Sequence, residues 1–208
     1  MGTRSDIIAQ LSNGKWKRIY CHWDGYLSHN GKILFDHYTD QKHVDALMAL
    51  GNLSSLRESV GVKHPFDAPP MCKPGSTAWE DNPAYTRFKK KYGNMCTAYI
   101  RDRGMGNWHY AKTKAEFLES ESGTTGDNLH AVWPEEDCAT EFTYVWDGQK
   151  WWVGDPDEGA QTLIDLGDAL SGKQAITPKV KAFGVNFVIG KHLPHDPTEP
   201  DDHTWSSK

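Results

Sequence analysis

Two stretches of the chain carry the pattern of a β-hairpin. In each, two runs of aromatic, β-branched or alternating residues flank an Asn-Gly or Asp-Gly dipeptide, which is the strongest short-range hairpin signal. The runs are 3–11 and 16–23 around Asn13-Gly14, and 141–146 and 150–153 around Asp147-Gly148. We therefore predict two antiparallel strand pairs, one at the start of the chain and one over 141–153.

Helical patterns follow the first hairpin. Residues 41–50 place apolar side chains at i, i+3 and i+4, which is one face of a helix, with Asp40 as the N-cap and Gly51 after the end. A preceding helix is predicted over 29–38, with Ser28 as its cap.

The other segments have weaker patterns. They predict a helical turn at 54–60, a strand at 95–102, a short helix at 112–120, a polar loop at 121–140, a helix at 161–170 and a strand at 179–189. Five prolines make 61–93 a long irregular excursion, and the composition of 191–208 predicts a disordered tail. Because strands come in hairpins and not in strict alternation with helices, we expect one α+β domain over 1–190. Its sheet should be antiparallel or mixed, with helices mainly on one face.

The composition favours a folded domain without general affinity for nucleic acid. The 208 residues include nine Trp, eight Tyr and seven Phe, whereas disordered chains are poor in aromatics. The net charge is −5, and nonspecific nucleic-acid binding needs a positive surface that displaces counterions. The composition leaves the oligomeric state open.

Several features predict a cytoplasmic protein without a membrane segment. No apolar run approaches the length of about 20 residues that a membrane helix needs, and the N-terminus lacks an apolar signal region. The four cysteines include no C-x-x-C pair, which indicates reduced thiols.

The densest group of chemically active side chains follows the first hairpin. His22 and Asp24 share one face of a strand end, and His29 arrives from the next helix, so either histidine is a candidate general base helped by Asp24. The same three residues are weak candidates for a metal site. Cys21 is a candidate nucleophile, although a buried structural thiol is the favoured interpretation.

Arginines form the second candidate group. Arg101 and Arg103 flank Asp102 at a predicted strand end, and guanidinium groups bind phosphate or carboxylate in a bidentate manner. Arg4 joins them if its strand is a neighbour, and Tyr26 and Trp108 are candidates to stack on a base. The nearby glycines match neither the dinucleotide fingerprint nor the P-loop, so the cofactor remains open.

A combination of short segments gives the chain a family resemblance. The segments are Met1-Gly-Thr-Arg-Ser, the YCHWDGY motif of residues 20–26, His29-Asn-Gly-Lys, Leu50-Gly-Asn-Leu-Ser-Ser-Leu, Tyr92-Gly-Asn-Met-Cys and Arg101-Asp-Arg-Gly. Together they resemble a family of small uncharacterised proteins encoded by tailed bacteriophages. The resemblance covers roughly residues 1–60, 92–104 and 141–153. It implies expression in an infected bacterial cytoplasm, but no particular activity.

Three functions are therefore expected, in this order. The first is a phage-encoded accessory protein that binds a host protein or a small anionic, nucleotide-like ligand and thereby blunts a host function. The second is a small hydrolase or transferase that acts on a phosphorylated or nucleotide substrate, and the third is a minor virion component. Whether the protein is an enzyme is left open at this stage.

Overall fold

The computed structural model describes residues 3–61, 90, 94–98, 116, 119–134, 140–176, 179–182 and 185–188. Almost all of the predicted excursion at 61–93 lies outside these residues, as does the whole of the predicted tail at 191–208. Of the predicted helix at 112–120, only 116, 119 and 120 are described, and all three are helical. The strand prediction for 95–102 is covered only up to residue 98.

The centre of the fold is a mixed β-sheet with the order β4-β3-β2-β1-β6-β7-β8, and β5 pairs with β2 off this path. The pairs β1–β6 and β2–β3 are parallel, whereas the others are antiparallel. The strands are β1 (Ser5–Gln10), β2 (Trp16–Cys21), β3 (Leu53–Ser55), β4 (Thr97–Ala98), β5 (Thr124–Gly126), β6 (Phe142–Trp146), β7 (Trp151–Gly154) and β8 (Ile164–Asp165). A separate antiparallel pair joins β9 (Lys179–Ala182) and β10 (Val185–Val188).

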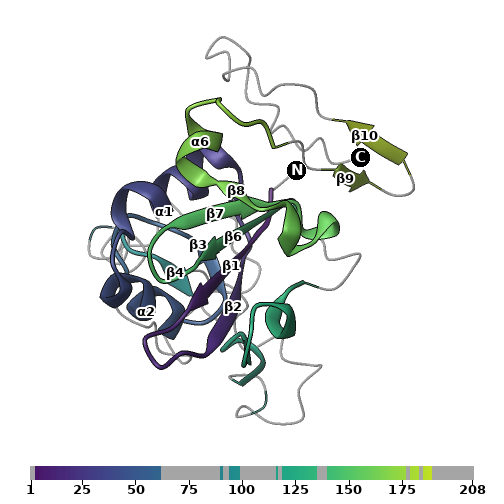
Figure 1. Cartoon of the computed structure of the whole chain (residues 1–208). Coiled ribbons are helices and arrows are strands. Elements are labelled where there is room, and N and C mark those ends of the chain that lie inside the picture. The colour runs from purple at the N-terminus through teal and green to yellow at the C-terminus, as the bar shows by residue number, and fades with distance from the viewer. Residues whose placement is uncertain are drawn as a thin grey trace, which may run out of the picture.

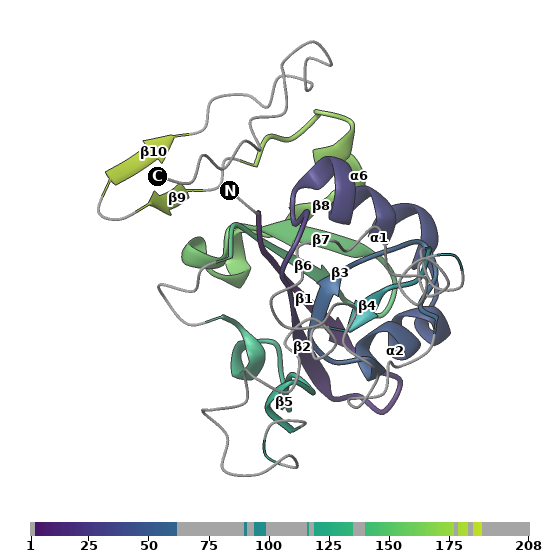
Figure 2. The same ribbon diagram turned by 180° about the vertical axis from the view of Figure 1, so that it is seen from behind.

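The α-helices lie along one face of the sheet, as Figures 1 and 2 show from opposite sides. They are α1 (Lys32–His37), α2 (Gln41–Ala49) and α6 (Leu166–Leu170), and a π-helical turn, η1 (Leu27–Gly31), leads into α1. Short 3-10 turns occur at η2 (His130–Val132), η3 (Pro156–Glu158) and η4 (Ala160–Thr162). The predicted α+β fold is therefore confirmed. No helix within the described residues is long and apolar enough to cross a membrane.

Both hairpins form where the sequence predicts them. β1 and β2 join through a turn in which Gly14 has a φ of 80°, and β6 and β7 join through Gly148 with a φ of 95°. Helix α2 is also confirmed, because the Asp40 side chain accepts a hydrogen bond from the backbone of His43 at the helix start.

Several local predictions were wrong. The predicted turn at 54–60 begins with strand residues instead, because the Ser54 carbonyl accepts from the Trp23 N–H and Ser55 pairs with Thr97 of β4. The predicted helix at 161–170 is α-helical only from Leu166, after the end of η4 and the strand β8, and the predicted loop at 121–140 contains β5 and η2. The predicted strand at 179–189 is two paired strands. Ser28 lies inside η1 and is not a cap, because the turn starts one residue earlier.

Strand β1 is buried on both faces because each face packs against a hydrophobic cluster. Ile7 and Ala9 join the larger core beneath the helices, whereas Ile8 packs against Val132 and Val145 in a smaller core on the other face. The sequence pattern of β1 correctly groups Ser5, Ile7 and Ala9 on one face, but it does not show that the opposite face is covered as well.

Asp6 brings a carboxyl group into this buried strand. Its side chain accepts a hydrogen bond of 2.9 Å from the hydroxyl of Thr140, and the residue is only 5% exposed. Burial raises the pKa of Asp6 from 3.8 to about 6, although the positive charge of Arg18 and the hydrogen bond from Thr140 oppose the shift. The folded protein therefore binds this proton more tightly than the unfolded chain does.

The raised pKa of Asp6 predicts that the free energy of unfolding decreases as the pH rises from about 4 to about 6, by at most about 3 kcal/mol. The reason is that the carboxylate must ionise while it is buried. Asp6→Asn mimics the protonated form, so we expect it to abolish this loss and to stabilise the protein at neutral pH. Urea unfolding at several pH values measures the effect. Asp127→Asn removes an exposed carboxylate and serves as the control. An Asp6→Asn protein that keeps the wild-type loss between pH 4 and pH 6 would contradict the prediction.

Candidate functional site

The segment that connects β2 with α1 is held tightly against the sheet. Asp24 has a φ of 59°, a left-handed conformation that aspartate tolerates better than most residues. Gly25 follows, and its backbone N–H donates to the carbonyl of Thr3 at 2.8 Å, while its own carbonyl accepts from the Tyr144 hydroxyl at 2.7 Å. A Cβ atom at Gly25 would lie only 2.5 Å from the carbonyl carbon of Arg4, so this close approach requires glycine.

Asn30 is the buried polar residue around which this segment is organised. The two hydrogens of its side-chain NH₂ group are shared among three nearby acceptors: the Ser5 hydroxyl at 3.2 Å, the Trp23 carbonyl at 3.3 Å and the Cys21 sulfur at 3.4 Å. Its amide oxygen lies 3.0 Å from Nδ1 of His29. A buried amide is costly unless its polar atoms are paired, so these contacts fix the position of Asn30.

Gly31 allows the next turn to pass close to the core. A Cβ atom at this position would lie 3.2 Å from the Tyr144 ring and 3.4 Å from Leu166. The motif His29-Asn30-Gly31-Lys32 therefore has a structural explanation, because its two inner residues are buried and its two outer residues reach the pocket described below.

His29 lies between the buried Asn30 and an arginine that reaches it from the other side. Nη1 of Arg57 lies 3.3 Å from Nε2 of His29. The backbone of Arg57 is held in turn, because the Tyr38 hydroxyl donates to its carbonyl at 2.8 Å and the Cys96 sulfur accepts from its N–H at 3.3 Å. Both partners of this contact are thus anchored to the larger core.

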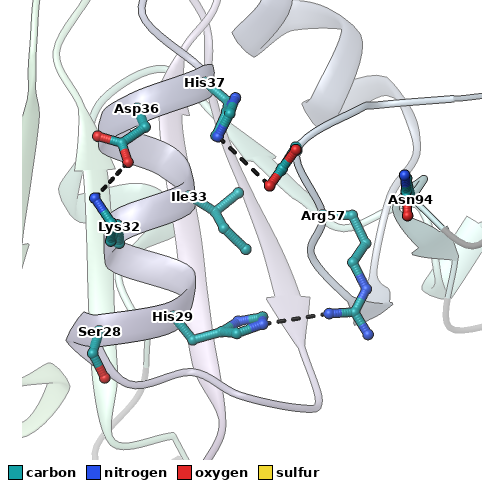
Figure 3. Close-up of a pocket in the computed structure, with 9 residues that line it drawn as sticks. Ser28, His29, Lys32, Ile33, Asp36, His37, Arg57 and Asn94 are labelled. Carbon is teal, nitrogen blue, oxygen red and sulfur yellow. Dashed lines mark hydrogen bonds and ion pairs between the residues drawn. The ribbon is translucent and has the colours of Figure 1, made fainter. Parts of the chain in front are cut away.

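A pocket of about 480 Å³ opens where these two side chains meet. Its lining combines cationic, imidazole, carboxylate and neutral groups: Lys32, Arg57, His29, His37, Asp36, Glu58, Ser28, Ile33 and Asn94. Figure 3 shows His29 and Arg57 pointing toward each other at one end, and His37 facing a carboxylate at the other.

The charges in the pocket are separated along its length. Lys32 pairs with Asp36 at 2.7 Å on α1, and His37 lies 4.0 Å from Glu58, so both carboxylates already have partners at one end. The other end contains Arg57, whose Nη1 contacts an imidazole nitrogen of His29 and not a carboxylate. An anion would therefore meet the least opposing charge beside His29 and Arg57.

His22 does not share this site. It follows Tyr20 on the sheet face opposite to Cys21, and its Nδ1 lies 2.7 Å from the Tyr20 hydroxyl. Its ring also packs edge-on against Trp23. Within the described residues, no three His, Cys, Asp or Glu side chains come together as a metal site would require, and this holds for His22, Asp24 and His29.

The structure describes two of the predicted anion-binding residues, Tyr26 and Arg4. Tyr26 lies beside the site, with its ring 5.8 Å from that of His29, and burial followed by the Asp24 carboxylate raises its pKa. Arg4 is half-buried before β1, where its backbone N–H donates to the Glu141 carboxylate. The other predicted residues lie outside the described part of the chain: Arg101, Arg103 and Trp108.

Cys21 has the properties of a structural thiol. It is completely buried and contacts Asn30, and burial raises its pKa to about 12. A nucleophilic cysteine needs an accessible thiolate, which this environment disfavours. The favoured interpretation of Cys21 from the sequence therefore agrees with the structure.

A smaller hollow of about 240 Å³ lies elsewhere, with Asp6, Arg18 and Tyr20 among its lining residues. These three residues occupy the face of β1 and β2 that points away from the helices.

Sequence reasoning missed Arg57 and the role of Asn30. Arg57 lies in a short segment without a clear periodic pattern, and its proximity to His29 depends on the parallel pairing of β2 with β3. Asn30 carried a usable signal, because an Asn-Gly pair directly after a histidine is uncharacteristic of a helix interior.

Comparisons of the chain with protein-family models, with curated proteins and with solved structures found no match.

The close approach at Gly25 predicts that Gly25→Ala destabilises the protein by about 2–3 kcal/mol, because its Cβ would overlap the Arg4 backbone. Gly172→Ala is the control, since it has a φ of 74° but open space around the added atom, and should cost only about 1 kcal/mol. Urea unfolding measures both values. Equal losses in the two variants would show that the contact with Arg4 is not restrictive.

Proposed function

We propose that this protein binds a small anionic ligand, of which a phosphoryl compound is the simplest example, at the end of the pocket formed by His29 and Arg57. The observation that carries the proposal is the contact between Arg57 and a histidine held from behind by the buried Asn30. The guanidinium has five N–H donors, and its contact with His29 uses one of them. Arginine also suits the geometry of phosphate oxygens.

The rest of the pocket supports a ligand larger than the anion alone. Its volume of about 480 Å³ lies in the range of sites for organic molecules. Beyond the His29–Arg57 end, Ile33 offers an apolar contact, and His37 with Glu58 offers polar groups at the far end. This arrangement suits a ligand with a charged head and a partly polar body, such as a nucleotide-like compound.

The biological setting is proposed from the sequence resemblance. We place the protein in the cytoplasm of a phage-infected bacterium, as an accessory binding protein rather than an enzyme. A host protein remains the alternative partner, and a minor virion component remains the third prediction. Analysis of purified particles by mass spectrometry tests the virion role, which predicts a fixed copy number per particle.

A hydrolase or transferase is the second candidate function, and one observation favours it. Of the two histidines that the sequence nominated as general bases, His29 lines the pocket, whereas His22 lies on the other face of the sheet. A panel of nucleotides and sugar phosphates, incubated with the protein and followed by ³¹P NMR, tests this function. Product formation that is lost in His29→Gln would establish catalysis, and unchanged substrates would favour a binding role.

The binding proposal predicts that Arg57→Gln weakens the affinity for inorganic phosphate about ten-fold or more, because the variant loses a charge-assisted hydrogen bond. Isothermal titration calorimetry measures the dissociation constant. Arg18→Gln is the matched control, since Arg18 projects from the other sheet face and should leave the affinity unchanged. Undiminished phosphate binding by Arg57→Gln would contradict the proposed site.

A further inference from the structure

The orientation of the Asn30 amide is determined by its buried partners. The carbonyl of Trp23 can only accept a hydrogen bond, so the side-chain atom of Asn30 that faces it at 3.3 Å must be the NH₂ nitrogen. The amide oxygen therefore faces Nδ1 of His29, at 3.0 Å. Because that oxygen can only accept, Nδ1 must carry a hydrogen.

The opposite side of the His29 ring leads independently to the same assignment. Arg57 has only donors and keeps its proton in proteins, so Nε2 of His29, 3.3 Å from Nη1 of Arg57, must accept. His29 is thus the neutral tautomer with hydrogen on Nδ1 and a lone pair on Nε2. Two separate contacts, on opposite sides of the ring, require this one arrangement.

We infer from this that the pocket selects an oxyanion that carries an O–H donor beside its charged oxygens, of which hydrogen phosphate is the simplest case. This inference rests on the proposed function and adds the chemical class of the ligand. The O–H group would donate to Nε2 of His29 in place of Arg57, and the N–H group of Arg57 released from this contact would donate to a charged oxygen. Each donor thereby keeps an acceptor.

An oxyanion without a hydrogen fits this arrangement poorly. Sulfate resembles hydrogen phosphate in size and charge, but its oxygens can only accept hydrogen bonds. Placed against the lone pair of Nε2, a sulfate oxygen would leave two acceptors facing each other in a partly buried site. Sites that use a hydrogen bond of this kind discriminate strongly against analogues that lack the hydrogen.

The experiment compares inorganic phosphate with sulfate by isothermal titration calorimetry in mildly alkaline buffer, where phosphate keeps one O–H group. We expect the wild-type protein to bind phosphate about ten-fold or more tightly than sulfate. His29→Gln should lose most of this preference, because a glutamine amide can rotate to donate to either anion. His130→Gln replaces an exposed histidine of η2 and is expected to keep the preference.

The possible results separate the inference from the proposed function. If phosphate and sulfate bind equally, and Arg57→Gln weakens both, the anion site stands and the selectivity for a hydrogen-bearing ligand is overturned. If neither anion binds the wild-type protein, the proposed function fails and the inference fails with it. A phosphate preference that persists in His29→Gln would also overturn the role of His29. Circular dichroism of each variant checks that it is folded.

Discussion

The buried amide of Asn30 links three parts of the molecule that are separated in the sequence. Its NH₂ group contacts Ser5 at the start of β1, Cys21 at the end of β2 and Trp23 just beyond it, and its oxygen contacts His29 at the pocket. Each contact satisfies a polar group that burial would otherwise leave unpaired. The geometry of the pocket is therefore coupled to the centre of the sheet.

This coupling explains how the segment between β2 and α1 is held against the sheet. The segment before α1 is fixed by backbone contacts of Gly25 and by the close passage of Gly31 over Tyr144. Arg57, on the other side of the pocket, has its backbone held by the buried side chain of Tyr38. Binding residues supported in this way lose little conformational freedom when a ligand arrives.

The parts of the fold that could be predicted from the sequence are those that local interactions determine. An Asn-Gly or Asp-Gly turn and an aspartate cap act within a few residues, so both hairpins and α2 were predicted correctly. The parallel pairing of β1 with β6 joins strands more than a hundred residues apart, and no local pattern encodes it. Ser54 and Ser55 of the short strand β3 were assigned to a helical turn for the same reason, since the strand depends on pairing with β2 and β4.

The candidate site, too, could be predicted only where local sequence determines it. His29 was nominated from the sequence because histidine and aspartate gather near the end of the first hairpin, and it does line the pocket. His22 is close to it in sequence, but strand alternation turns His22 to the sheet face opposite to Cys21. His29 lies in η1 beside Asn30, which contacts Cys21. Arg57 could not be paired with His29 without knowledge of the order of the strands.

The protonation of the His29 ring tests this account most directly. Nitrogen-15 NMR of the imidazole in the ligand-free protein distinguishes a nitrogen that carries hydrogen from one that does not. The account predicts hydrogen on Nδ1 and a bare Nε2, because Asn30 accepts from one side and Arg57 donates from the other. A His29 ring with hydrogen on Nε2 alone would contradict the account, because Asn30 would then not set the chemistry of the pocket.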